Sequence, residues 1–314
     1  KKISNAMLTE SYMGTLEKIF ANRAAPAPMP MEIPLCTKKF TGSPAIKIAK
    51  PRVFIPVFPG TNCEIDTARA FEKAGAEAQI LVVQNLSRRD IEQTIDAMER
   101  GIRESQMIML PGGFSGGDEP EGSGKFIATT FRNPKIAHAV ASLLEERDGL
   151  ILGICNGFQA LIKLGLVPYG KITQPKADDP TLTFNNIGRH VSRMVYTRVT
   201  SVKSPWFSGV NAGDVFAVPV SHGEGRFVAD DVSLQRLIEN GQIATQYATP
   251  DGKPSGEITW NPNGSVCGIE GITSPDGRVL GKMGHSERKG IDLYKNVPGL
   301  KDQQIFESGV KYFK

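Results

Sequence analysis

Short apolar runs alternate with amphipathic stretches between residues 52 and 164. Each run has the length of a buried strand, and the stretches between them show the 3.6-residue apolar period of a helix. The expected strands lie at 53–58, 79–83, 107–110 and 150–154, and the expected helices at 62–75, 87–103, 134–146 and 156–164. Four strand–helix units in succession predict a parallel sheet with helices on both faces and right-handed crossovers.

The pattern changes after residue 165, where β-branched residues and turn sequences such as Pro262-Asn-Gly and Pro275-Asp-Gly become frequent. The expected strands here are 194–199, 215–220, 243–247, 265–272 and 279–283, with one helix at 232–240. We expect these strands to run antiparallel and to extend the same sheet. The predicted fold class is therefore α/β, a doubly wound and mostly parallel sheet with an antiparallel strand-rich extension.

The first fifty residues do not follow this alternation. Residues 8–22 predict an amphipathic helix with Thr9 as a candidate N-cap, and the Pro-rich stretch 24–34 predicts an extended strap. The helix either docks on this domain or is the tail of a larger preceding one. Its apolar stripe consists of Tyr12, Met13, Leu16, Ile19 and Phe20.

Three segments follow from these patterns. Residues 1–6 resemble the remnant of an expression vector, because they end in Ser-Asn-Ala before Met7. The helix and the strap occupy residues 7–50, and the α/β domain occupies residues 51–314.

Composition narrows the class of protein and its partners. Of the 314 residues, 40% are hydrophobic and 22% are charged, which excludes collagen, coiled coil and wholesale disorder. A net charge of +4 is too small and too scattered for a nucleic-acid binder. The sequence has no apolar stretch of about 20 residues, no signal-peptide pattern and only four dispersed cysteines, so we expect no membrane partner and a cytoplasmic location.

The strongest candidate for chemistry is Cys155, which lies between an expected strand and an expected helix. Gly153 and Gly157 flank it in the pattern Gly-x-Cys-x-Gly. This pattern is typical of a nucleophile elbow, a strained turn that holds the thiol above the sheet edge. We expect the helix N-terminus to stabilise its thiolate. Cys63 lacks such an elbow and is expected to be non-catalytic.

A thiol nucleophile needs a base, and two histidines have a carboxylate at the right spacing. His285 is followed by Glu287 and His222 by Glu224, so each pair can share one face of an extended segment. Spacing alone does not choose between them. The His222 loop, which also holds Arg226, is interpreted either as a structural turn or as an accessory element beside the site.

The Cys155 motif, together with Pro111-Gly-Gly and the distal His285-Ser-Glu287, resembles the class I (triad) glutamine amidotransferases, which have a flavodoxin-like fold. The resemblance implies a triad of Cys155, His285 and Glu287, with Ser286 where that family usually has proline. It also implies an oxyanion hole and a subsite for L-glutamine. The residues implied are Gly113 and Asn156, through their backbone N–H groups, for the oxyanion, and Gln159 and Gly112 for the substrate.

Further motifs narrow the resemblance to the glutaminase of phosphoribosylformylglycinamidine synthases. These motifs are Phe58-Pro-Gly-Thr-Asn-Cys63-Glu, Pro111-Gly-Gly-Phe-Ser-Gly-Gly-Asp118, Phe184-Asn-Asn-Ile, Val220-Ser-His-Gly-Glu-Gly-Arg-Phe227 and Asn261-Pro-Asn-Gly-Ser265. In the large single-chain form of that enzyme the glutaminase is C-terminal, which makes residues 7–50 the end of a synthetase portion. The resemblance implies hydrolysis of glutamine to glutamate and ammonia. A synthetase portion would use that ammonia, with ATP and magnesium, to convert formylglycinamide ribonucleotide to formylglycinamidine ribonucleotide in purine biosynthesis.

Under this interpretation the chain itself holds no cofactor and no metal. Its glycine-rich stretch at 112–125 lacks the P-loop pattern, so ATP and magnesium are expected only in the synthetase portion. Two alternatives remain: a glutaminase that serves a CTP-type or GMP-type synthetase, and a non-catalytic docking domain of the same fold. The strand-rich segment 166–284 argues against the first, and the intact Cys155, His285 and Glu287 argue against the second.

Overall fold

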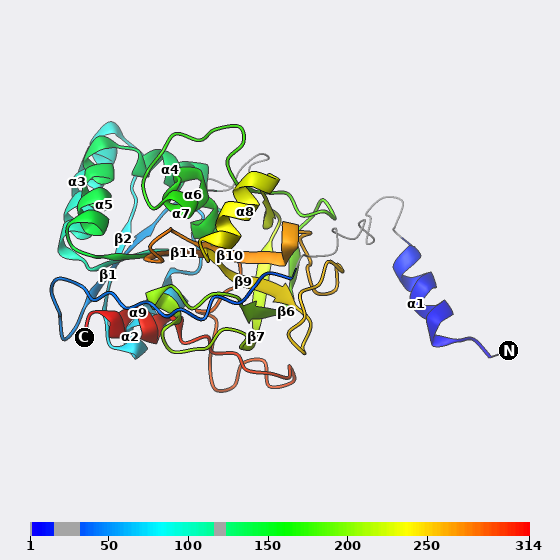
Figure 1. The fold of residues 1–314 in the computed structure, drawn as a ribbon. Coiled ribbons are helices and arrows are strands. Elements are labelled where there is room, and N and C mark those ends of the chain that lie inside the picture. The colour runs from blue at the N-terminus through cyan, green and yellow to red at the C-terminus, as the bar shows by residue number, and fades with distance from the viewer. Residues whose placement is uncertain (1, 16–31, 116–123) are drawn as a thin grey trace.

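A nine-stranded sheet forms the centre of the protein, whose computed structural model describes residues 2–15, 32–115 and 124–314 (Figure 1). Its strands are β1 (Arg52–Val57), β2 (Glu77–Val82), β3 (Met107–Leu110), β4 (Leu150–Ile154), β6 (Val191–Val199), β7 (Val215–His222), β9 (Ile243–Ala248), β10 (Ile269–Thr273) and β11 (Val279–Lys282). They lie in the order β2-β1-β3-β4-β11-β10-β9-β6-β7.

The half of the sheet from β2 to β4 is parallel, as the alternation predicted. β1 pairs with both β2 and β3, and β3 pairs with β4. Every residue of β3 and β4 is buried, which explains why both appear in the sequence as continuous apolar runs. The carboxyl ends of β3 and β4 therefore lie side by side, one residue away from Pro111 and Cys155.

The other half extends the same sheet, and the expectation of antiparallel strands is confirmed. β11 is parallel to β4, and β10, β9, β6 and β7 follow with antiparallel pairing. A separate two-stranded sheet of β5 (Thr181–Thr183) and β8 (Arg226–Val228) was not predicted. The strand expected at 265–272 begins only at Ile269, because Val266–Gly268 form a 3-10 turn in which Cys267 has φ +50°.

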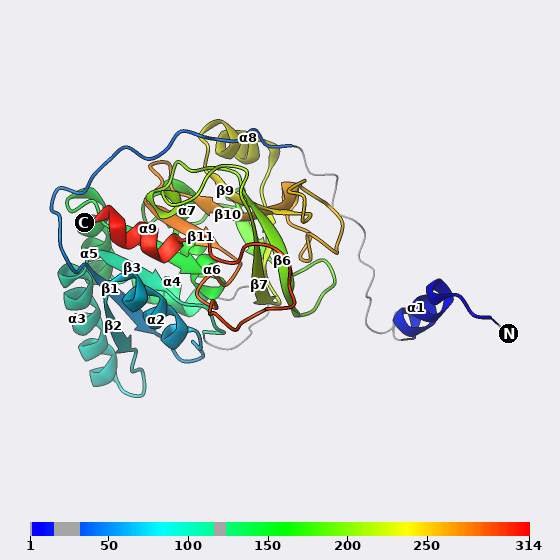
Figure 2. The same cartoon turned by 90° about the horizontal axis from the view of Figure 1, so that it is seen from below.

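Helices cover both faces of the sheet (Figures 1 and 2). They are α2 (Glu64–Ala74), α3 (Arg88–Glu104), α4 (Lys125–Phe131), α5 (Pro134–Glu145), α6 (Asn156–Leu164), α7 (Leu166–Tyr169), α8 (Asp231–Glu239) and α9 (Ile305–Tyr312). In Figure 1, α2 and α9 lie together on one face, and α3, α5 and α6 lie on the other. The helices predicted for this domain are confirmed within a few residues, whereas α4, α7 and α9 were not predicted.

The N-terminal helix α1 (Asn5–Gly14) stands apart from the domain in Figures 1 and 2. Its N-cap is Ser4, whose Oγ accepts a hydrogen bond from the Met7 N–H, so the prediction of Thr9 as the cap is wrong. Tyr12 is 83% exposed. The C-terminal part of the predicted stripe, from Leu16 onward, lies outside the described residues.

Residues 32–50 run as an extended strap along the domain. The Cys36 N–H donates to Thr200 O, and the Ile48 N–H donates to Phe313 O near the C-terminus. The prediction of an extended segment is confirmed for this part, while residues 24–31 lie outside the described ranges. Among the helices that the structure describes, none is long and apolar enough to cross a membrane.

Candidate active site

Cys155 occupies a strained turn between β4 and α6. Its φ of +53° and ψ of −106° are unusual for a residue with a side chain. The glycines on both sides are required by close packing. A Cβ on Gly157 would lie 2.0 Å from Leu110 O, and one on Gly153 would lie 2.7 Å from Gly157 O. The sheet edge therefore holds Cys155 in one fixed position, as a nucleophile elbow does.

The thiol of Cys155 is almost completely buried, with 4% of the residue exposed. Its Sγ donates to Ser221 O at 3.6 Å. Burial, with the nearby Cys63 and Glu287, raises the pKa of Cys155 to about 12, although the Asn156 N–H and Arg288 oppose this. The Asn156 N–H at the helix N-terminus thus favours the thiolate, in the direction expected from the sequence, but burial is the larger effect and the thiol is protonated at rest. A thiol in this state would need a neighbouring base to take its proton before it could act as a nucleophile.

His285 and Glu287 form a buried pair after β11. The Nδ1 atom of His285 lies 2.5 Å from Glu287 Oε1. Burial disfavours the Glu287 carboxylate, but the charge and hydrogen bond of His285 outweigh it and lower the pKa of Glu287. An ionised Glu287 accepts the Nδ1 hydrogen, so that in the neutral imidazole it is His285 Nε2 that carries the lone pair. Within the described part of the chain this Nε2 atom is buried and makes no hydrogen bond.

A buried ion pair holds the turn that carries His285. Lys282 Nζ lies 3.2 Å from Glu270 Oε1, and both side chains are inaccessible to solvent. Lys282 Nζ donates to Gly284 O at 2.7 Å, and the Gly284 N–H donates to Glu270 Oε1 at 2.5 Å. The carbonyl of Lys282 also accepts the Cys155 N–H at 2.8 Å. Lys282 thus contacts Cys155 through its backbone carbonyl and the turn that carries His285 through its side chain.

Two of the glycines predicted at the site stand where backbone and side chains approach closely. A Cβ on Gly112 would lie 2.7 Å from His285 Cε1, so the end of β3 lies directly against the imidazole. Gly113 has φ +148°, and a Cβ there would lie 2.7 Å from Gly60 O. The structure thus brings Gly112 and Gly113 to the same sheet edge as Cys155.

The predicted residues of α6 hold the loop above the site. Asn156 Oδ1 accepts the Ser115 N–H, and Asn156 Nδ2 donates to Gln159 Oε1 at 3.0 Å. Gln159 Nε2 donates to Glu224 O at 2.6 Å. Both polar ends of the buried Gln159 amide therefore already have protein partners. This residue fastens the His222 loop to α6.

The His222 loop is built around Asn185. His222 Nδ1 lies 3.2 Å from Asn185 Oδ1, whereas Arg226 binds the same segment from outside, through Phe184 O and Asn186 Oδ1. Burial, and then the neighbouring His285 and His190, lower the pKa of His222 to about 3. His222 is therefore neutral at physiological pH. Of the two histidines, His285 has a carboxylate partner, Glu287. The partner of His222 Nδ1 is an amide oxygen.

Several residues of this site were not predicted from the sequence. Cys63 Sγ lies 3.9 Å from His285 Nδ1 and accepts a hydrogen bond from Arg288 at 3.1 Å. Cys63, His285 and Glu287 offer ligand atoms within 4.8 Å of one another, a set that a metal ion could use. Here, however, Nδ1 is engaged by Glu287 and the thiol by a cationic guanidinium, and burial raises the pKa of Cys63 to about 11. In the sequence, these two residues are marked only by their positions: Cys63 lies directly before α2, and Arg288 directly follows Glu287.

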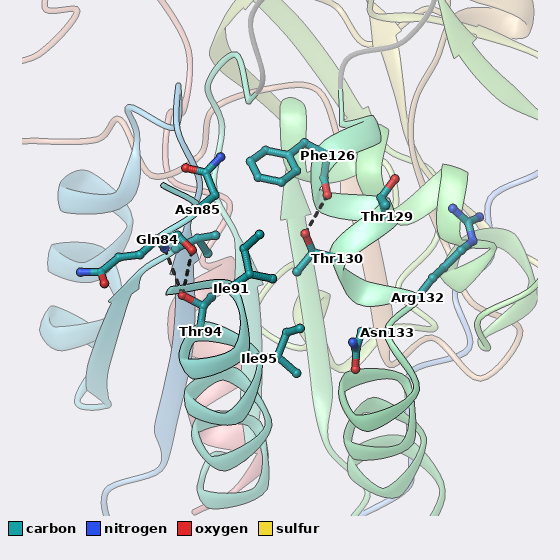
Figure 3. A pocket seen from close by; sticks show the side chains of 11 residues that line it. Gln84, Asn85, Ile91, Thr94, Ile95, Phe126, Thr129, Thr130, Arg132 and Asn133 are labelled. Carbon is teal, nitrogen blue, oxygen red and sulfur yellow. Dashed lines mark hydrogen bonds between the residues drawn. The ribbon is translucent and has the colours of Figure 1, made fainter. Parts of the chain in front are cut away.

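A separate pocket of about 500 Å³ opens between α3 and the α4–α5 region (Figure 3). Its lining includes Gln84, Thr94, Phe126 and Arg132. Thr94 Oγ1 is already bound to the backbone of Gln84, and the Arg132 guanidinium donates to Lys163 O. None of the triad candidates lines this pocket, so it is distinct from the site at Cys155.

Comparison with known proteins agrees with this geometry. The family model of the CobB/CobQ-like glutamine amidotransferase domain matches residues 50–313. The chain is 34% identical over 286 residues to phosphoribosylformylglycinamidine synthase subunit PurQ of Methanococcus maripaludis, covering 84% of this chain and 97% of that protein. The PurQ subunit of Treponema denticola is 34% identical over 284 residues, covering 84% and 99%. A chain in the structure of PurLQS from Thermotoga maritima matches with a TM-score of 0.59 and 28% identity, covering 84% of this chain and all of that chain.

Proposed function

The chain belongs to the CobB/CobQ-like glutamine amidotransferase family, and on that premise we propose that Cys155, His285 and Glu287 are its catalytic triad. The protein is a glutaminase that supplies ammonia to phosphoribosylformylglycinamidine synthesis in purine biosynthesis. One observation carries the triad assignment. A strained cysteine stands at the carboxyl edge of the sheet, and its N–H binds Lys282 O, three residues before a buried histidine whose Nδ1 is held by a carboxylate.

The first half of the reaction transfers the γ-glutamyl group of glutamine to sulfur. Because the Cys155 thiol is protonated at rest, His285 Nε2 takes its proton as the sulfur attacks the carboxamide carbon of glutamine. The Gly113 and Asn156 N–H groups hold the oxyanion of the tetrahedral intermediate. His285 then gives the proton to the nitrogen, the C–N bond breaks, and ammonia leaves a γ-glutamyl thioester on Cys155.

The second half of the reaction restores the thiol. His285 takes a proton from water, whose oxygen attacks the thioester carbon, and the S–C bond breaks to release glutamate. The proton returns from His285 to sulfur. Glu287 keeps the imidazole in the tautomer with a free Nε2 and stabilises the imidazolium that forms in each half-reaction.

The ammonia is consumed outside this domain. PurQ relatives are named as subunits of a synthase, and PurLQS is a complex whose name includes such a subunit. We propose that the chain works with a synthetase partner that binds ATP and magnesium, in the cytoplasm. Residues 7–50 are the link to that partner, as in the single-chain form of the enzyme: the strap lies along the domain, and the apolar Tyr12 of α1 is exposed.

The test is a pair of cysteine variants assayed in the complete enzyme. Cys155→Ser should abolish glutamine-dependent synthesis and leave ammonia-dependent synthesis intact, because a serine hydroxyl is far less acidic than a thiol. Cys63→Ser is the matched control, since Cys63 is also buried and close to His285, and it should retain glutaminase activity. Glutamine-dependent activity that survives in Cys155→Ser would refute the triad.

A further inference from the structure

The side chain of His222 lies on the face of β7 that packs on the turn carrying His285. β7 passes directly beside the triad, because Pro219 O accepts the His285 N–H at 2.9 Å and Ser221 O accepts the Cys155 thiol. His222 lies four residues after Val218 on β7, so the two side chains are on the same face of the strand. A Cβ on Gly284 would lie 2.8 Å from Val218 Cγ2, so this face packs on the turn that carries His285.

The hydrogen bonds of Asn185 determine the tautomer of His222. Asn185 Nδ2 donates to His222 O at 2.8 Å and to Arg189 O at 3.0 Å, and the Gly225 N–H donates to Asn185 Oδ1 at 3.1 Å. The atom that faces His222 Nδ1 is therefore an oxygen, which only accepts. Nδ1 must carry the hydrogen, and Nε2 must be a bare lone pair.

This lone pair is buried and unused among the residues that the structure describes. His222 is 1% exposed, and its Nε2 makes no hydrogen bond there. A buried acceptor without a donor is unfavourable. The loop cannot easily move away to solvate it, because Gln159 Nε2 fastens the Glu224 carbonyl to α6. A ligand that brings an N–H or O–H to this atom would supply the donor that the described residues lack.

We propose that His222 Nε2 accepts a hydrogen bond from the carboxamide nitrogen of glutamine and from the ammonia that leaves it. This inference rests on the glutaminase function proposed above. When His285 protonates the departing nitrogen, that nitrogen becomes partly cationic, and a hydrogen bond from it to a neutral imidazole strengthens. His222 takes no proton at any step. Because the interaction is stronger in the transition state than in the substrate, it accelerates C–N cleavage.

The low basicity of His222 suits this role. Burial and the nearby His285 and His190 keep its pKa at about 3. A charged imidazolium in its place would offer a donor and a positive charge to a nitrogen that is itself becoming positive. The same neighbours that keep His222 neutral therefore keep it an acceptor.

Two substrates with the same acyl group separate this role from a structural one. L-Glutamine leaves as ammonia, whereas the γ-methyl ester of L-glutamate leaves as methanol and has no N–H to donate. Two variants probe the two ring nitrogens: His222→Asn places an amide near Nδ1 and retains the contact with Asn185, and His222→Gln places a carboxamide oxygen near Nε2. His138→Gln, on an exposed position of α5, is the control.

Measured in the complete enzyme, His222→Asn should lower kcat for glutamine by about 10- to 100-fold, the range for loss of a charge-assisted hydrogen bond. Its rate on the ester should change little. His222→Gln should recover part of the glutamine rate. If His222 is merely structural, His222→Asn should be more active than His222→Gln, and each variant should lose the same factor on both substrates. That result would overturn the inference. A wild-type enzyme that hydrolyses neither substrate would instead refute the glutaminase function, and the inference with it.

A second variant gives a pH readout that does not depend on replacing His222. Asn185→Asp puts a carboxylate beside Nδ1, which should raise the pKa of His222 and protonate Nε2 at neutral pH. Glutamine hydrolysis should then increase with pH relative to ester hydrolysis until His222 loses its proton. A constant ratio of the two rates across pH in a folded Asn185→Asp enzyme would contradict the acceptor role.

Discussion

Replacing Lys282 with methionine is expected to destabilise the protein strongly, because it leaves the Glu270 carboxylate buried and unpaired. Both side chains of this pair are fully inaccessible, and their charged atoms are 3.2 Å apart. Removing one partner of a buried pair costs about 3–5 kcal/mol. A domain typically has about 5–15 kcal/mol of stability in total. Lys282→Met should therefore lose a large share of the free energy of unfolding, measured by urea titration.

A double-mutant cycle shows whether this loss comes from the pair. Glu270→Gln leaves a buried ammonium and should also be costly, whereas the double variant leaves no charge behind. The loss in the double variant should be smaller than the sum of the single losses by at least about 1 kcal/mol. Lys135→Met, which removes an exposed ion pair with Asp96, is the control and should have little effect.

The same pair should affect the chemistry where the variants still fold. Lys282 and Glu270 bind the carbonyl and the N–H of Gly284, immediately before His285. A misplacement of about 1 Å in a catalytic group can lower the rate about 100-fold. We therefore expect kcat to fall more than KM rises. If Lys282→Met lost less than about 1 kcal/mol, or if the single losses added in the double variant, the assignment of a buried clamp would be wrong.

Three further predictions follow from the site. Gly157→Ala should lose at least about 2 kcal/mol of stability in urea unfolding, together with activity, because its Cβ would lie 2.0 Å from Leu110 O. Alkylation of resting Cys155 by iodoacetamide should accelerate about tenfold per pH unit from about pH 7 to about pH 9, because its pKa is about 12, and a plateau in this range would contradict that value. The free energy of unfolding should decrease as the pH falls from 6.5 toward about 3, by up to about 1.4 kcal/mol per unit, because unfolded His222 takes up a proton that the folded residue does not. In His222→Gln that part of the pH dependence should be missing.

The strands and helices that position the nucleophile could be predicted from the sequence because their signals are local. β3, β4 and α6 agree with the predicted ranges, and Gly153 and Gly157 mark the elbow directly. The helix α9 was missed because Gly309 lies in its middle, where glycine is unfavourable. Tertiary packing explains that glycine, since a Cβ there would lie 2.2 Å from Trp206 Cζ3.

The missing parts of the site depend on contacts between residues far apart in the chain. Cys63 lies beside His285 across 222 positions, and Asn185 fixes His222 across 37. No periodicity or spacing reports such contacts. The two His-x-Glu segments look equivalent in sequence, and only the fold shows that Glu287 binds its histidine while an amide binds His222. The α4 helix was missed because it is short and rich in threonine, which gives a weak local signal. Its packing on α6 is a tertiary contact.

The central claim is that glutamine is cleaved through a thioester on Cys155 formed with the help of His285. The most direct measurement is rapid quenching of the enzyme with glutamine, followed by peptide mass spectrometry of the cysteines. We predict one γ-glutamyl group on Cys155 and none on Cys63, with the adduct lost in Cys155→Ser and strongly slowed in His285→Ala. An adduct on Cys63, or normal adduct formation without His285 but not without His222, would contradict the account.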